Sequence, residues 1–179
     1  MQRFVKMAFA RCPRCGVKLL HPRQSHACGP FTVRRFLAGR SAPERELYRR
    51  FVALIAAAGP YELAPAKTRI AFLADVRFAS VNALGPRGLD VHLVLPRRLR
   101  NARFRKVERL GPLYVHHLRF TAPAELDAEV AAWVAASRTE YGERRWLARR
   151  RSVRSPASTA SGRRVRRGGR GARLPPARR

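Results

Sequence analysis

The chain has 179 residues and a formal net charge of +28, and 46% of its residues are hydrophobic. That length accommodates one ordinary domain with short attachments. It contains no apolar run of the roughly 20 residues that cross a bilayer, and its first residues lack the apolar centre and cleavage site of a signal peptide, so we expect a cytoplasmic protein without a membrane partner.

The positive charge is concentrated at the two ends of the chain. Residues 1–43 carry nine Lys or Arg and residues 144–179 carry fourteen Arg, and neither segment has an acid. Residues 44–143 carry sixteen basic side chains against all eleven acids. Basic ends attract nucleic acid or another polyanion by counterion release, without sequence preference. A passive tail is the alternative, because a very G+C-rich gene also encodes tracts of Arg, Gly, Ala and Pro.

All three cysteines fall in residues 1–30, which we predict to form a zinc knuckle. The first two cysteines stand in the form CPRCG, where a tight turn allowed by Gly16 points backbone N–H groups at the sulfurs. A histidine and the third cysteine follow after a ten-residue loop and complete a tetrahedral set. His21 is an alternative to the first-choice histidine. The predicted ligands are Cys12, Cys15, His26 and Cys28.

Such a zinc site would be structural, because four protein ligands leave no position for a water molecule. A segment this short folds only with its metal, so metal binding and folding are coupled. A CxxC pair can instead be a redox pair, but the thioredoxin-like βαβ pattern that accompanies redox pairs does not surround this one.

Two helices are predicted next. Residues 31–41 favour a short helix that begins after Thr32 and stops near Gly39, and Ser41 is a good N-cap for a longer helix that ends at Gly59. In the longer helix the apolar residues repeat at helical spacing and predict one buried stripe. The stripe consists of Leu47, Phe51, Leu54, Ile55 and Ala58.

Strands follow the long helix. Segments rich in β-branched and aromatic residues, punctuated by GPRG and GP turns, predict four or five strands. The connections are too short for βαβ crossovers, so the strands should pair antiparallel. The predicted strands are residues 67–74, 77–84, 89–95, 105–110 and 114–121.

A last helix is predicted from about Pro123 to Tyr141, with Thr121 as its cap. The order of helix, sheet and helix predicts an α+β domain over residues 31–143, with a small antiparallel sheet and helices on one face. The zinc knuckle precedes this domain. Residues 144–179 are of low complexity and are predicted to form a disordered Arg-rich tail.

Several separate pieces occur in the order typical of one family: CPRCG with RQSHACG, KTRIAF, RGLDVHLVLPRRL, YVHHLRF and AELDAEVAAW. On these pieces, residues 12–141 resemble the bacterial domain-of-unknown-function 5655 family, in the form with a short N-terminal zinc-finger-like segment. The resemblance implies a small α+β domain and no particular activity. The family usually begins just before the knuckle, so Met7 suits a start better than Met1, and the tail past Tyr141 lies outside the resemblance.

Basic and imidazole side chains recur on the predicted strands and are the candidate ligand-binding groups of the domain. Side chains two residues apart on a strand point to the same face of the sheet. His117 and Arg119 should therefore share one face, and so should Lys67 and Arg69. Such a face suits a phosphate or carboxylate. A solvated outer face is the alternative. The groups most able to converge are Lys67, Thr68, Arg69, Arg77, His92, His117 and Arg119.

The sequence does not support catalysis. Its acids Asp75, Asp90 and Glu108 are scattered, and it has neither a nucleophile elbow nor a glycine-rich phosphate loop. The leading hypothesis is a non-enzymatic, zinc-containing module that binds an anionic partner such as nucleic acid. The alternative is an enzyme or ligand-binding domain for a phosphorylated or carboxylated small molecule, acting through the basic sheet face. A scaffold for protein contacts is a third hypothesis.

Overall fold

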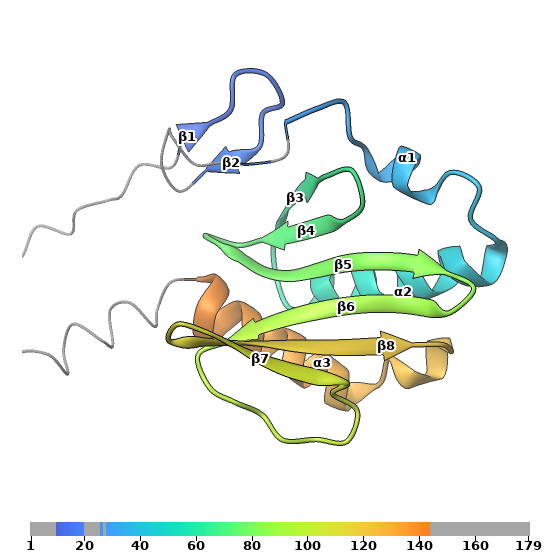
Figure 1. The fold of residues 1–179 in the computed structure, drawn as a ribbon, viewed down its shortest axis with the longest axis vertical. Coiled ribbons are helices and arrows are strands. Elements are labelled where there is room, and N and C mark those ends of the chain that lie inside the picture. Colours follow the sequence, from blue (N-terminus) through green and yellow to red (C-terminus); the bar gives the residue numbers. More distant parts are fainter. Residues whose placement is uncertain (1–9, 20–25, 27, 144–179) are drawn as a thin grey trace, which may run out of the picture.

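The computed structural model describes residues 10–19, 26 and 28–143. A small hairpin of β1 (Ala10–Arg11) and β2 (Lys18–Leu19) lies beside a six-stranded sheet. Figure 1 shows helices α2 and α3 on the same face of that sheet. His21 and the predicted tail lie outside the described residues, as do Met1 and Met7. The division of the chain near residues 30 and 143 stays a prediction.

The two predicted N-terminal helices are confirmed. In α1 (Val33–Leu37), the Thr32 hydroxyl accepts a hydrogen bond from the Arg35 N–H at 3.1 Å. In α2 (Ala42–Ala57), Ser41 and Glu44 form a reciprocal capping box. The buried side chains of α2 are Leu47, Tyr48, Phe51 and Ile55, whereas Leu54 and Ala58 of the predicted stripe are partly buried.

The sheet has six strands in the order β3-β4-β5-β6-β8-β7, and every neighbouring pair is antiparallel. Only four or five strands were predicted, because the strand over residues 62–65, with sequence ELAP, contains a proline. Pro65 is tolerated because this strand lies at the sheet edge. The strands are β3 (Glu62–Pro65), β4 (Ile70–Leu73), β5 (Arg77–Gly85), β6 (Gly88–Leu95), β7 (Lys106–Leu110) and β8 (Leu113–Phe120).

The predicted C-terminal helix is broken into three pieces. They are a 3₁₀ turn η1 (Pro123–Glu125), helix α3 (Ala128–Ala136) and a π-helical turn η2 (Ser137–Gly142). The prediction of Thr121 as cap was wrong. The Asp127 carboxylate caps α3 by accepting from the Val130 N–H at 3.1 Å, and this side chain ends the 3₁₀ turn by competing for backbone donors.

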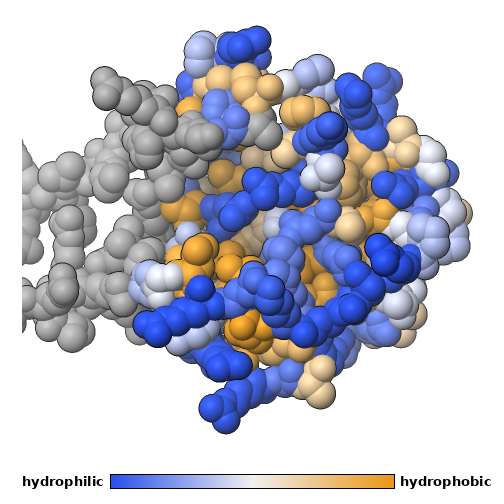
Figure 2. Space-filling view, in the orientation of Figure 1, coloured by the Kyte–Doolittle hydropathy of each residue, from blue (hydrophilic) through white to orange (hydrophobic). Residues whose placement is uncertain are grey.

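The hydrophobic core lies between α2, α3 and one face of the sheet. Strand β6 shows why the two faces differ: Leu89, Val91 and Leu93 are fully buried in the core, while Asp90 and His92 alternate with them on the opposite face. We call that opposite face the open face. Figure 2 shows hydrophilic side chains spread across it.

Candidate metal centre and open-face cavity

The knuckle turn lies between β1 and β2. The Gly16 N–H donates to the Cys12 carbonyl at 2.8 Å, and the Cys12 N–H donates to the Val17 carbonyl at 3.0 Å. Gly16 has φ of +70°, a conformation that a residue with a Cβ adopts at a cost. The CPRCG sequence therefore forms the tight turn that its glycine indicated.

Four metal-ligating side chains meet at this turn. The Cys12 and Cys28 sulfurs are 3.7 Å apart, and the Cys15 sulfur is 3.5 Å from His26 Nε2. All four ligand atoms lie within 4.8 Å of one another, and the three cysteines are free thiols. Cys12, Cys15, His26 and Cys28 thus lie close enough to bind a metal ion.

The turn also favours negative charge on sulfur. Backbone N–H groups, first that of Arg14 and then that of Cys15, lower the pKa of Cys12 to about 6. Burial, followed by hydrogen bonds to the neighbouring sulfurs, raises the pKa of Cys28 to about 11. A thiolate at Cys12 therefore disfavours ionisation of Cys28 by electrostatic repulsion, and a cation bound among the sulfurs would offset this repulsion.

Three contacts attach the knuckle to the sheet. Lys18 Nζ donates to the Ala74 carbonyl at 2.9 Å and lies 3.6 Å from the Glu62 carboxylate on β3. Arg11 pairs with the same carboxylate at 2.9 Å. Leu19 is buried. The metal ligands are consequently held against the β3 edge and the turn between β4 and β5.

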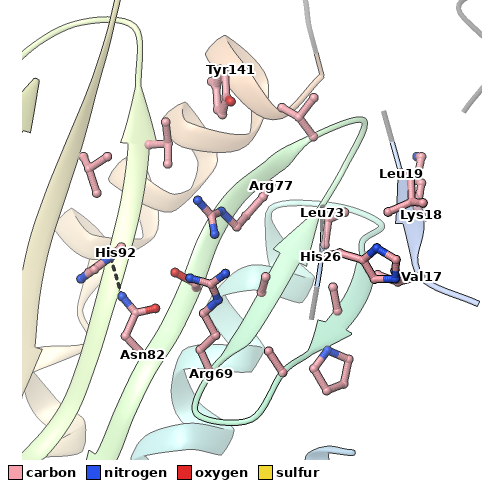
Figure 3. A pocket seen from close by; sticks show the side chains of 18 of the residues that line it. Val17, Lys18, Leu19, His26, Arg69, Leu73, Arg77, Asn82, His92 and Tyr141 are labelled. Carbon is pink, nitrogen blue, oxygen red and sulfur yellow. Dashed lines mark hydrogen bonds between the residues drawn. The ribbon is translucent and has the colours of Figure 1, made fainter. Parts of the chain in front are cut away.

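A cavity of about 460 Å³ lies between the knuckle and the open face. Figure 3 shows His26 and Val17 on one side of it and His92 with Asn82 on the other. Its floor is made of small and apolar residues that alternate with core residues along the strands. The floor residues are Ala64, Ala71, Leu73, Ser80, Val94 and Val115.

Two arginines extend over this floor. Figure 3 shows the guanidinium groups of Arg69 and Arg77 pointing into the cavity and toward one another. Both side chains are exposed at the rim, but desolvation by the surrounding protein and then repulsion from Arg69 lower the pKa of Arg77. Within the described part of the chain, neither guanidinium has a carboxylate within 4.0 Å.

His92 forms the far wall through contacts with its neighbours. Asn82 Nδ2 donates a hydrogen bond to His92 Nδ1, and the His92 and His117 ring centroids are 3.9 Å apart. Burial and the adjacent His117 lower the pKa of His92 to about 4, so His92 is neutral at pH 7. The Asn82 Oδ1 atom is buried and has no hydrogen-bond partner among the described residues.

The remaining predicted residues have other surroundings. Arg119 makes a two-point ion pair with Asp90 at 2.6 and 2.8 Å, and His117 Nε2 lies 2.9 Å from Glu108. The expectation that Lys67 and Arg69 share a strand face was wrong, because β4 begins at Ile70 and both precede it. Lys67 and Thr68 are exposed in the turn before β4.

Sequence reasoning missed Asn82. The register between β5 and β6 shifts at this residue, which leaves Asn82 without a Cα partner on β6 and beside His92. A bulge of this kind has no reliable mark in a single sequence. Arg77 was predicted as a candidate residue. The approach of its guanidinium to Arg69 was not predictable, because it depends on the geometry of the turn between β4 and β5.

One comparison with known proteins gives a result. The family described as a domain of unknown function (DUF5655) matches residues 33–138, which include all of the six-stranded sheet and both long helices but not the metal ligands. No curated protein and no solved structure matches the chain. None of the helices in the described residues is long and apolar enough to cross a membrane. The chain belongs to the DUF5655 family.

Proposed function

We propose that the protein is a non-enzymatic, zinc-containing module that binds an anionic partner. The spacing of the ligand atoms carries the zinc assignment. A tetrahedral zinc with usual Zn–S and Zn–N bonds of about 2.3 and 2.0 Å requires sulfur–sulfur edges of about 3.8 Å and sulfur–nitrogen edges of about 3.5 Å. The Cys12–Cys28 and Cys15–His26 edges are 3.7 and 3.5 Å, and all four ligand atoms lie within 4.8 Å of one another.

The donor set supports a structural role for the metal. Three sulfurs and one imidazole nitrogen suit zinc and leave no open coordination position for a reacting water. Thiol ligands of this kind persist in a reducing compartment, in keeping with the expected cytoplasmic location. Two of the acids on the open face are engaged: Asp90 by Arg119, and Glu108 by His117 and Lys106. These pairings support a binding function rather than acid–base chemistry.

The distribution of unpaired arginines supports an anionic partner. In the connection between β6 and β7, Arg97 and Arg103 bind carboxylates of the C-terminal helices. Arg98, Arg100 and Arg105 of the same connection are exposed, and within residues 28–143 none has a carboxylate within 4.0 Å. Together with the net charge of +28, these side chains suit a phosphate backbone.

The test begins with metal content and ends with nucleic acid. Native mass spectrometry of the full chain should show one zinc ion. His26→Asn removes a ligand and should lose the ion, whereas His117→Asn replaces a histidine outside the cluster and should retain it. Filter binding to mixed-sequence DNA and RNA should then weaken steeply with salt, with a slope near −0.9 per phosphate contact on duplex DNA. The triple variant R98Q/R100Q/R105Q should bind less tightly and with a shallower slope. Absence of zinc, or no binding to either nucleic acid at low salt, contradicts the proposal.

A second candidate function is supported by the cavity. The guanidiniums of Arg69 and Arg77 extend over an apolar floor without a carboxylate within 4.0 Å in the part of the chain that the structure describes, and such groups suit a phosphorylated or carboxylated small molecule. This is the function of an enzyme or ligand-binding domain that acts through the basic open face. It is compatible with the same zinc site.

A further inference from the structure

The cavity has the composition of a small-molecule site. Its volume of about 460 Å³ falls in the usual range for such sites, and its lining combines an apolar floor with a few polar groups. The hollow has a simple structural cause. In one row across the sheet, Ala64, Ala71 and Ser80 are followed by His92, so small side chains on three strands end at a large one on the fourth.

Two of the charges in this hollow have no carboxylate within 4.0 Å among the described residues, those of Arg69 and Arg77. Among the described lining residues, Lys18, Arg69 and Arg77 are basic, and Asp75 is the acid. Lys18 already contacts the Ala74 carbonyl and the Glu62 carboxylate. The two arginines instead face one another across the cavity, an arrangement that repulsion disfavours and an anion stabilises.

The far wall is a neutral, hydrogen-bonded pair. Because the Asn82 amide nitrogen can only donate, His92 Nδ1 accepts, and the proton of the neutral ring is on Nε2. In Figure 3 this second ring nitrogen lies on the side away from Arg69 and Arg77, so Asn82 and His92 close the cavity without adding a charge. The near wall includes His26, whose Nε2 is one of the four metal-ligating atoms.

We propose that this cavity binds a small organic molecule with an oxyanion group, phosphate or carboxylate, held between Arg69 and Arg77. The body of the ligand packs on the floor around Leu73 and Val94, and the metal fixes His26 as one wall, so binding requires the metal. This inference deepens the second candidate function and rests on the metal binding proposed above.

Phenyl phosphate and benzoate are suitable probes, with inorganic phosphate as a reference without an apolar body. In ¹H–¹⁵N chemical-shift titrations of the zinc-loaded full chain, at least one organic probe should shift amides of β4, β5 and β6. It should also bind about tenfold more tightly than inorganic phosphate, because its ring buries apolar surface. Preference for phenyl phosphate assigns a phosphate ligand, and preference for benzoate assigns a carboxylate ligand.

Two matched variants test the arginine clamp. R69Q and R77Q should each weaken the better probe about tenfold, as loss of one charge-assisted contact predicts. Arg50→Gln removes an equal charge from an exposed position of α2, on the other side of the sheet, and should change affinity less than twofold, and circular dichroism should show all three variants folded. Equal affinities in the three variants, shifts scattered over the surface, or no binding of either organic probe would overturn the inference.

Metal removal tests whether ligand binding requires the metal. A chelator should abolish probe binding, and added zinc should restore it. Binding that persists in metal-free protein rejects the role of His26. If the protein contains zinc and binds nucleic acid but neither organic probe, the leading function stands and this inference fails. If it contains no zinc, the leading function fails. Probe binding that R69Q and R77Q weaken would then support the clamp and reject the role of His26, and absence of binding would overturn the inference.

Discussion

Two histidines on adjacent strands, His92 and His116, occupy places that disfavour their protonation. His116 is fully buried, its Nε2 accepts the Leu99 N–H at 3.0 Å, and its ring centroid lies 4.9 Å from that of Phe104. Burial is the main cause that lowers the pKa of both residues, that of His92 to about 4. Both rings are therefore neutral in the folded protein at pH 7.

This neutrality makes stability depend on pH. The unfolded chain takes up a proton at each histidine near pH 6.5, whereas folded His92 does so only near pH 4. Stability should therefore fall as the pH drops from 6.5 toward 4. Between pH 7 and pH 5, the His92 contribution should shift the folding equilibrium about twentyfold toward the unfolded state.

Urea titrations of the wild type and of His92→Asn at both pH values measure this contribution. The groups that face His92 are His117, Arg77, Glu108 and Asp90, and they are unchanged in the variant. The metal ligand His26 is also common to both proteins, so its own acid sensitivity cancels in the difference. An unfolding free energy with the same pH dependence in both proteins contradicts the prediction.

Single residues also show how far the sequence predicted the site. Cys12 and Cys15 were predicted from the local chemistry of a tight turn, and His26 and Cys28 because a tetrahedral metal needs two more ligands; the four do lie close together. Asn82 was missed because its place beside His92 depends on a bulge between two strands. Arg119 was taken for a ligand group because a sequence does not show that Asp90 lies opposite it across the β6–β8 pair.

At the scale of elements, α2 depends on its first turn. The Ser41 hydroxyl accepts the Glu44 N–H at 3.4 Å, and the Glu44 carboxylate accepts the Ser41 N–H at 2.6 Å. Ser41→Ala removes this cap and should lower the free energy of unfolding by about 1 kcal/mol. Ser41→Thr keeps a hydroxyl and should lower it by less. Urea unfolding measures both changes, and equal stabilities of the two variants contradict the role of the cap.

The elements that the sequence predicted well are those whose signals are local. Capping residues and apolar spacing predicted α1 and α2, alternation predicted β6 and β8, and β-branched and aromatic residues bounded by a turn predicted β5. Strand β3 was missed because four residues with a proline carry a weak strand signal, and it forms only by pairing with β4. The last helix was predicted as continuous because its apolar spacing continues through Asp127, which in fact starts a new helix.

At the scale of the whole molecule, the metal site and the main core are separate. The core extends from α1 residues such as Val33 to Tyr141 and includes none of the described residues of the knuckle. A chelator should therefore leave the far-ultraviolet circular dichroism and the cooperative thermal unfolding nearly unchanged. It should also raise the number of thiols that react rapidly with a thiol reagent from none to three. Loss of cooperative unfolding in the metal-free protein contradicts this separation.

The docking of the knuckle has a consequence for self-association. Both edge strands of the sheet present unpaired backbone groups, with which strands of other molecules can pair and aggregate. Strand β7 is short and its exposed side chains include Lys106, Glu108 and Arg109, which discourage such pairing. At the β3 edge, Pro65 lacks an N–H, and Arg11 of the knuckle is paired with Glu62. The knuckle thus also protects one edge of the sheet against aggregation.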